Sequence, residues 1–366
     1  MATSALDKLV DKMLGTYTNG VVMDLRRIDS IPEVERVPLE SPKMESLFGT
    51  GGVPVGRVIE IFGGESSGKS SMCEYIAGQF QKHTFEKMND KGELVKRKGV
   101  VVYIDAENAI SLDFAFVHGF DVSKAILVQP ESGEQACDIA IQFAESGLVD
   151  LIILDSIAAL TPVAEIEGDM EQQFMGLQAR MLSKFFRKIS AILNKTGTTM
   201  LCVNQTRTNL GVYGAPDTTP GGKSLKFFSS VRINLRKKED ITEKDEAKGI
   251  IIACKTVKNK TAPPMVKQLL TMMWDTSFDA RMEWVDFAIE NGIIEMAGGG
   301  NATLPSGTKI KGKANLIEYL SKPENKEEYD KVIKLTREKM EEVSKSKPKR
   351  VSVDEDDEDD IVEDEE

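Results

Sequence analysis

Short runs of apolar residues alternate with amphipathic stretches through the middle of the chain. Val100–Asp105 and Leu151–Asp155 are apolar at successive positions before a closing aspartate, a pattern typical of strands covered on both faces of a parallel sheet. Similar runs predict strands at Arg57–Phe62, Val100–Asp105, Ala125–Gln129, Leu151–Asp155, Thr199–Asn204, Val231–Leu235 and Ile250–Thr256. Helical periodicity follows Lys69 and runs through Gly133–Glu145 and Met175–Leu193. This order of elements predicts an α/β fold with a mostly parallel central sheet.

Two stretches interrupt this alternation. Residues 206–222 are rich in Gly, Pro and Thr and have almost no apolar periodicity; a loop of that length inside a compact domain is usually functional or disordered. From about Trp274 onward, helical patterns surround Gly298–Gly300 and the basic stretch Lys309–Lys313. We therefore predict a small C-terminal α/β domain.

The net charge of −12 comes from the end of the chain. Of the 59 acidic residues, 11 lie in 354–366, where no basic residue occurs, so 48 acidic and 47 basic residues remain in the body. Residues 206–238 hold seven basic residues and one acidic one, with aromatic residues between them. That composition suits binding of a single-stranded nucleic-acid backbone. A solvated basic face is the alternative, but it does not explain the long loop.

Cysteine and histidine usage excludes some classes of site. The cysteines (Cys73, Cys137, Cys202 and Cys254) are far apart and form no C-x-x-C pair, which favours reduced, buried thiols in an intracellular protein. His83 and His118 have no Cys or His neighbour at ligand spacing, so we expect no zinc site. We expect no membrane span, because no apolar run is long enough to cross a bilayer.

A phosphate-binding motif follows the first predicted strand. Residues 63–70 read GGESSGKS, which satisfies G-x-x-x-x-G-K-[ST] between a strand and a helix. In such a loop backbone N–H groups face the phosphates, Lys69 reaches the β- and γ-phosphates and Ser70 ligates Mg²⁺. An ordinary glycine-rich turn is the alternative. We predict that ATP and Mg²⁺ are bound by Gly63, Gly64, Glu65, Ser66, Ser67, Gly68, Lys69, Ser70 and Ser71.

Two carboxylates lie at the carboxyl ends of predicted strands. Asp155 ends an apolar strand, where a second carboxylate completes a magnesium site in P-loop proteins. Taken alone, it would be an ordinary turn residue. Glu107 follows another buried strand, at the edge where α/β sheets bind ligands. We predict that Glu107 orients the attacking water, with a plain surface carboxylate as the alternative.

Taken in order, these residues resemble the bacterial RecA family, and the resemblance extends beyond the P-loop. It is carried by Tyr103–Ala109, Leu154–Pro162, Glu165–Gly168, Met175–Arg180, Asn204–Arg207, Gly221–Phe227, Ser230–Arg232 and Val257–Lys260. It spans about Pro38 to Pro264, with weaker similarity at Gly312–Asn315. A P-loop alone marks a vast superfamily, whereas this ordered set is specific to recombinases.

The resemblance implies a DNA-dependent ATPase with a RecA-like core. Such a protein would form helical filaments on single-stranded DNA and exchange strands with double-stranded DNA, in the cytoplasm of a bacterial or phage-infected cell. It implies four parts: an N-terminal helix and linker that contact a neighbouring subunit (1–37), the core (38–270), the C-terminal domain (271–342), and a linker with a disordered acidic tail (343–366).

The resemblance also implies further catalytic residues. Gln205, at the root of the loop 206–222, would sense the γ-phosphate and order or loosen that loop; a buried glutamine that caps a strand is the alternative. Lys258 and Lys260 would point to one side of a strand and reach a neighbouring subunit's ATP, as an arginine finger does. Without the family they would be surface lysines. Phe114 matches an adenine-stacking position but could equally be a core residue.

Two loops resemble DNA-binding loops, the first at Glu165–Phe174 and the second at 206–222. The residues implied in DNA binding are Met175, Gly176, Arg180, Arg187, Arg207, Gly221, Gly222 and Lys223. Lys226, Arg232 and Arg236 match or neighbour family positions that contact DNA or other subunits.

Departures from the family pattern indicate a phage-encoded or otherwise divergent member. Gly64 replaces a proline, Asn108 replaces a histidine, and the connection Gln81–Gly99 is longer than usual. One alternative is a ring-forming helicase or ATPase on the same core. Another is a recombination mediator that binds DNA and ATP without hydrolysis, against which Glu107 argues.

Overall fold

The computed structural model describes residues 5–16, 34–88, 93–169, 176–206 and 220–345. It divides into two units, Met1–Glu35 and Arg36–Glu366. In the first unit, helix α1 (Ala5–Thr16) exposes Leu6, Leu9 and Met13. No helix in the described ranges combines the length and the apolar character needed to cross a bilayer.

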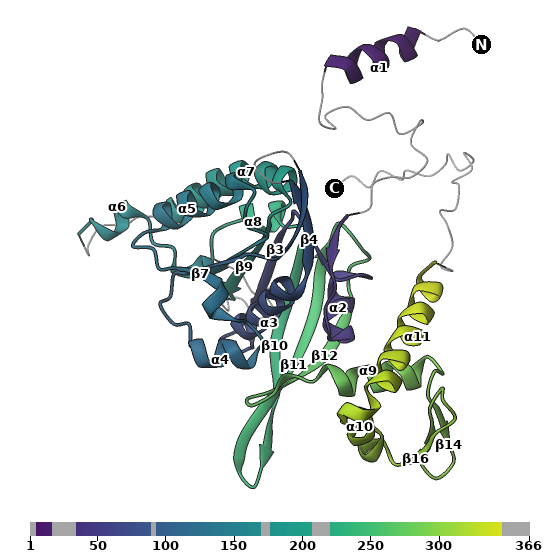
Figure 1. The fold of residues 1–366 in the computed structure, drawn as a ribbon. Coiled ribbons are helices and arrows are strands. Elements are labelled where there is room, and N and C mark those ends of the chain that lie inside the picture. Colours follow the sequence, from purple (N-terminus) through teal and green to yellow (C-terminus); the bar gives the residue numbers. More distant parts are fainter. Residues whose placement is uncertain (1–4, 17–33, 89–92, 170–175, 207–219, 346–366) are drawn as a thin grey trace, which may run out of the picture. The chain divides into compact units, whose positions relative to one another are not determined.

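A nine-stranded sheet forms the centre of the second unit (Figure 1), in the order β13-β12-β11-β10-β3-β9-β8-β6-β7. Neighbours from β10 to β7 are parallel, and those from β10 to β13 are antiparallel. The strands are β3 (Val58–Gly63), β6 (Val101–Asp105), β7 (Ala125–Val128), β8 (Leu151–Asp155), β9 (Thr199–Gln205), β10 (Val231–Glu243), β11 (Glu246–Asn259), β12 (Lys267–Met273) and β13 (Ser277–Phe278). The predicted α/β fold with a mostly parallel sheet is confirmed.

Apolar cores cover both faces of this sheet. Helix α3 (Lys69–Lys82) contributes to one core, and α5 (Gly133–Ser146) with α7 (Leu177–Thr196) contributes to the other. Successive strand residues alternate between the two, because Ile153 belongs to the first core and Ile152 to the second. All the cysteines are free and buried, as predicted.

The antiparallel side of the sheet differs most from the predicted elements. Strands β10 and β11 have 13 and 14 residues and continue as an exposed two-stranded ribbon. Lys244 and Asp245 turn this ribbon with φ values of 52° and 65°, the geometry of a tight hairpin turn. The predicted ranges ended β10 too early and began β11 too late, because the polar outer halves of both strands have no apolar pattern. Strands β12 and β13 were not predicted.

A second hairpin fills the long connection between residues 81 and 99. Strands β4 (Thr84–Met88) and β5 (Leu94–Lys98) pair with each other. Arg97 fixes this hairpin to the amino end of β8, because its guanidinium lies 2.5 Å from the fully buried carboxylate of Asp150. The same carboxylate accepts a hydrogen bond of 2.8 Å from the Val100 amide.

The C-terminal elements enclose a separate apolar cluster that includes Val285, Leu316 and Val332. They are α9 (Ala280–Glu290), β14 (Glu295–Ala297), β15 (Asn301–Thr303), β16 (Lys309–Lys311), α10 (Lys313–Ser321) and α11 (Lys326–Lys345). The short elements elsewhere are β1 (Arg36–Val37), α2 (Pro42–Phe48), β2 (Val53–Pro54), α4 (Leu112–Val117), α6 (Val163–Ile166) and α8 (Ser224–Phe228). The predicted linker from residue 343 begins inside α11, and the acidic tail lies outside the described residues.

Candidate functional site

The phosphate-binding motif has the strand–turn–helix geometry that its sequence predicts. Gly63 ends β3 and Lys69 begins α3. A Cβ atom at Gly63 would lie 2.1 Å from the Leu235 carbonyl oxygen, and one at Gly68, where φ is +81°, would lie 2.6 Å from Ile252 Cδ1. The turn passes so close to β10 and β11 that only glycine fits at these positions. The first N–H groups of α3 have no partner within the helix and are available to a phosphate.

Lys69 and Ser70 place their functional atoms beside this turn. The Lys69 ammonium donates a 2.6 Å hydrogen bond to the Gly64 carbonyl, and Ser70 Oγ donates one of 2.7 Å to Asp155 Oδ2. Burial lowers the pKa of Lys69, and the charges of Asp155 and Glu107 oppose this shift. The cation on its own loop and the paired oxygens of Ser70 and Asp155 fit a phosphate chain and a hard divalent ion respectively.

The other residues of the loop differ in exposure. Gly64, Glu65 and Ser66 are exposed, whereas Ser67 and Ser71 are buried. Ser67 Oγ donates a 2.9 Å hydrogen bond to the Gly64 carbonyl. The loop therefore combines a fixed inner side with an open outer side.

Tyr103 is a neighbour of this site that sequence reasoning missed. Its hydroxyl donates a 2.7 Å hydrogen bond to the same oxygen of Asp155 that Ser70 contacts. Burial raises the pKa of the Asp155 carboxyl, while the hydrogen bonds from Ser70 and Tyr103 hold it down. Tyr103 therefore helps to keep Asp155 ionised and fixed in orientation.

Glu107 and Gln205 meet at the carboxyl edge of the sheet. Glu107 Oε1 accepts hydrogen bonds from Ser156 Oγ and, at 3.2 Å, from Gln205 Nε2. Both Glu107 and Gln205 are exposed, so the alternative of a buried glutamine that caps a strand does not fit the geometry. This contact joins Glu107, the predicted water-orienting residue, to Gln205, which directly precedes the second loop.

Asp105 supports the turn that carries Glu107, and sequence reasoning missed it as well. Its carboxylate is buried and accepts the amides of Ala109 and Ile110, each at 3.2 Å. The sequence signal that could have identified it is the aspartate that closes its apolar run, as Asp155 closes the run at 151–154. The structure pairs the two residues in the β6–β8 register.

Phe114 belongs to an aromatic cluster rather than to either main core. It is half-buried in α4, and its ring centroid lies 4.5 Å from that of His118 and 6.3 Å from that of Trp274. Trp274 was not predicted, because the strand that precedes it, β12, was not recognised. The two partly exposed rings could offer a stacking surface to a planar base.

Of the two candidate lysines, Lys258 lies in β11 and Lys260 directly follows it, so the two do not share one strand as predicted. Lys258 is half-buried, and its ammonium donates hydrogen bonds to the carbonyls of Lys226 (2.6 Å) and Phe227 (3.1 Å) in α8. Lys260, which follows the strand, is exposed. Burial lowers the pKa of Lys258, and the charges of Lys260 and Arg232 lower it further.

The described candidate DNA-binding residues gather at the start of α7 and at the end of the second loop. Gly176 caps α7 with φ of 77°. A Cβ atom at Gly221 would lie 2.7 Å from Leu182 Cδ1, and one at Gly222 would lie 3.1 Å from the Ala179 Cβ. The end of the loop therefore packs directly on the first turns of α7.

The charged members of this set lie at the surface. Arg180, Arg187 and Lys223 are exposed, whereas Met175 and Arg207 lie outside the described residues. The resemblance linked Arg232 with contacts to DNA or to other subunits. Its guanidinium turns inward and forms an ion pair with the fully buried carboxylate of Glu60.

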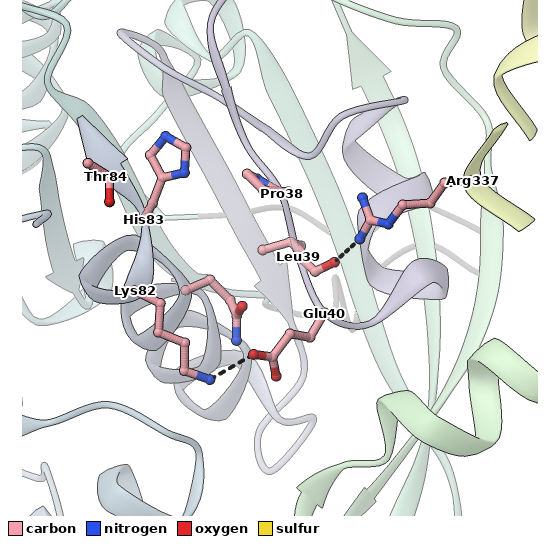
Figure 2. A pocket seen from close by; sticks show the side chains of 8 residues that line it. Pro38, Leu39, Glu40, Lys82, His83, Thr84 and Arg337 are labelled. Carbon is pink, nitrogen blue, oxygen red and sulfur yellow. Dashed lines mark hydrogen bonds and ion pairs between the residues drawn. The ribbon is translucent and has the colours of Figure 1, made fainter. Parts of the chain in front are cut away.

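A separate pocket of about 270 Å³ lies beside the end of α3. Figure 2 shows Lys82 paired with Glu40 and Arg337 beside the Leu39 carbonyl. The Lys82 ammonium lies 2.9 Å from Glu40 Oε1, and Arg337 donates a 3.3 Å hydrogen bond to the Leu39 carbonyl. The pocket is lined by Pro38, Leu39, Glu40, Gln79, Lys82, His83, Thr84 and Arg337. No predicted site residue lines it, so it is distinct from the phosphate-binding loop.

The fold and the site together define a P-loop nucleotide-binding protein of the α/β class. A family model described as the RecA N-terminal domain matches residues 4–279. Protein RecA of Staphylococcus aureus strains JH9 and Newman is 38% identical over 334 residues, which cover 90% of this chain and 91% of the relative. The chain belongs to the RecA family.

Proposed function

We propose that this protein is a DNA-dependent ATPase that forms helical filaments on single-stranded DNA and exchanges strands with homologous duplex DNA. The observation that carries this proposal is the 3.2 Å hydrogen bond between Gln205 and Glu107. It connects a carboxylate suited to ATP hydrolysis with the root of a long loop flanked by basic residues. Such a contact would let nucleotide state and DNA binding influence each other.

The residues around the P-loop suit hydrolysis of ATP. Lys69 would leave its carbonyl partner for the β- and γ-phosphates, and Ser70 with Asp155 would hold Mg²⁺, which neutralises phosphate charge when bound. Glu107 would orient the attacking water, with its own orientation fixed by the hydroxyl of Ser156. Gln205 would exchange its bond to Glu107 for one to the γ-phosphate.

The remaining candidate residues suit an assembly of many copies on DNA. Lys258 and Lys260 would reach the ATP of a neighbouring subunit, where trans cations stabilise the transition state. The exposed Arg180, Arg187 and Lys223 would contact DNA phosphates. Phe114, with Trp274, would stack on the adenine base. These substrates would place the protein in the cytoplasm of a bacterial or phage-infected cell.

A strand-exchange assay between linear duplex and homologous circular single-stranded DNA tests the proposal. With ATP and Mg²⁺, the wild-type protein should form joint molecules and hydrolyse ATP faster when single-stranded DNA is present. Glu107→Gln should bind ATP but hydrolyse it about 10²–10⁴-fold more slowly, because a positioned base contributes that factor. Hydrolysis is measured by phosphate release and binding by a fluorescent ATP analogue.

The control is Glu145→Gln, which neutralises an exposed carboxylate on α5 and should leave both activities unchanged. DNA-dependent hydrolysis without joint molecules, with rings in electron micrographs, would support the helicase alternative. Binding of both ligands without hydrolysis would support the mediator alternative.

A further inference from the structure

A buried polar cluster lies in the middle of the central sheet. Glu60, in β3, is fully buried between β9 and β10. One carboxylate oxygen accepts a 3.1 Å hydrogen bond from Asn204 Nδ2 on β9. The other forms an ion pair with Arg232 on β10. Glu60 therefore connects the strands on either side of it through separate oxygens.

Asn204 continues the cluster to both ends of the second loop. The same amide nitrogen lies 3.2 Å from the carbonyl oxygen of Pro220, the first described residue after the gap at 207–219. The Asn204 side-chain oxygen accepts a 3.0 Å hydrogen bond from the backbone amide of Gln205. One side chain thus holds the residue before the loop and the residue near its end.

Arg232 continues the cluster in the opposite direction. Its guanidinium lies over the Phe62 ring, 4.6 Å from the centroid, and in the β10–β11 register Arg232 pairs with Lys258. Burial is the main cause of the lowered pKa of Lys258, but Arg232 adds to the lowering and Glu60 opposes it. The charges of the cluster therefore act on Lys258.

Stability alone does not explain this arrangement. Taking a carboxylate and a guanidinium out of water costs several kcal/mol per ion, and well-packed apolar residues are often as stable as a buried ion pair. Val58 and Phe62, which share the face of β3 that bears Glu60, are buried and apolar, so this face of the strand otherwise accepts apolar side chains. A buried pair of this kind is better suited to fix register and orientation than to add stability.

We propose that Glu60 is a positioning residue that couples the second loop to the strand that bears Lys258. Through Asn204 it fixes both ends of the loop, and through Arg232 it fixes the side chain that pairs with Lys258 in the β10–β11 register. DNA binding at the loop would then alter the placement of the inter-subunit lysine. The inference rests on the proposed DNA-dependent ATPase activity.

Glu60→Gln tests the coupling, because the amide keeps the size of the side chain and removes its charge. The measured quantity is the ratio of ATP hydrolysis with single-stranded DNA to hydrolysis without it. We expect this ratio to fall by a factor within the range of about 5–150 that is typical of coupling between sites. Affinity for a fluorescent ATP analogue in the absence of DNA should stay within about twofold, since Glu60 contacts no residue of the phosphate-binding turn among the described hydrogen bonds.

Asp150→Asn is the matched control. Asp150 is also a fully buried carboxylate with an arginine partner, but it lies at the amino end of β8. Its neutralisation should lower the melting temperature as Glu60→Gln does, yet leave the stimulation ratio at the wild-type value.

Asn204→Leu provides a second variant in case Glu60→Gln does not fold. It removes the hydrogen bonds of Asn204 to Glu60 and to Pro220 but keeps the ion pair of Glu60 and Arg232, and it should also lower the stimulation ratio. A wild-type protein without DNA stimulation would refute the proposed function itself. If the wild type is stimulated, two results overturn the coupling: folded Glu60 and Asn204 variants with the wild-type ratio, or an equal loss in Asp150→Asn.

Discussion

Glu74 and His118 form a buried pair with opposed titration behaviour. His118 Nε2 lies 3.8 Å from Glu74 Oε2, and neither atom has a hydrogen-bond partner among the described residues. Burial raises the pKa of Glu74 to about 7, with the nearby charge of Asp155 adding to the effect, and burial lowers the pKa of His118 to about 4. His118 Nδ1 lies 2.7 Å from Ser277 Oγ. Each group therefore lowers the free energy of unfolding at pH values where it is charged in the unfolded chain but neutral in the folded protein.

The stability of Glu74→Gln and that of His118→Leu, each relative to wild type, should depend on pH in opposite directions. Because the pKa of Glu74 is raised from 4.5, its stabilising contribution is present below pH 4.5 and is lost as the pH rises to about 7. Glu74→Gln should thus gain unfolding free energy relative to wild type across this window, on the order of 3 kcal/mol. The pKa of His118 is lowered from 6.5, so its contribution is present above pH 6.5 and is lost toward pH 4.

His118→Leu should accordingly gain free energy relative to wild type as the pH falls from 6.5 to 4. Urea unfolding at pH 5 and pH 8 measures both differences. Differences that are the same at the two pH values would show that folding shifts the pKa of neither group.

The local sequence predicted the chemical roles of single residues better than it predicted which residues they contact. Lys69, Ser70 and Asp155 were identified from a motif and a strand end, because each of those signals lies within a few residues. Glu60 gave no such signal, and Asn204 ended a predicted strand without being assigned a role. Their roles depend on contacts between strands that are far apart in the sequence, which a linear pattern cannot show.

At the scale of elements, β11 carries Lys258, which we expect to act on the ATP of a neighbouring subunit. Lys258→Ala should reduce DNA-stimulated ATP hydrolysis strongly, because a trans cation contributes about 10³–10⁵-fold in comparable sites. The variant's own P-loop should still bind ATP. Steady-state phosphate release and binding of a fluorescent ATP analogue measure the two effects.

Mixing Lys258→Ala with Lys69→Ala tests directly whether Lys258 acts on the ATP of a neighbouring subunit. The first variant supplies intact P-loops and the second supplies intact Lys258 side chains, so mixed filaments should recover part of the activity. No recovery despite verified co-assembly would mean that Lys258 acts within its own subunit or has no catalytic role.

The sequence predicted the bounds of a strand well where successive residues of that strand are all buried. Strand β8 matches its predicted range, and β6 differs by one residue at its start, because both have five buried residues in succession. The outer half of β10 and the hairpin of β4 and β5 are partly exposed. Backbone pairing, rather than an apolar pattern, defines those strands, so periodicity could not locate them.

At the scale of the whole molecule, the acidic tail should limit entry of duplex DNA. Its 11 carboxylates at 354–366 would compete with DNA phosphates for the exposed Lys309, Lys311 and Lys313 of the C-terminal domain. Truncation after Val353 should raise duplex binding and lower the Mg²⁺ concentration that strand exchange requires. Filter binding and strand-exchange assays across a Mg²⁺ series measure both.

Hydrolysis on single-stranded DNA serves as the internal control and should be nearly unchanged by the truncation. The alternative is a tail that only maintains solubility. In that case the truncated protein would keep the wild-type Mg²⁺ optimum and precipitate more readily.

Because every cysteine is buried, the folded protein exposes no native thiol to thiol-specific reagents. Burial raises the pKa of each thiol, to about 12 for Cys137, and the thiolate is the reactive form. A single cysteine introduced at an exposed position, such as Lys223 beside the second loop, would therefore be labelled alone without removal of the native four. Slow labelling of the native thiols would report transient opening of the two apolar cores, one through Cys73 and Cys254 and the other through Cys137 and Cys202.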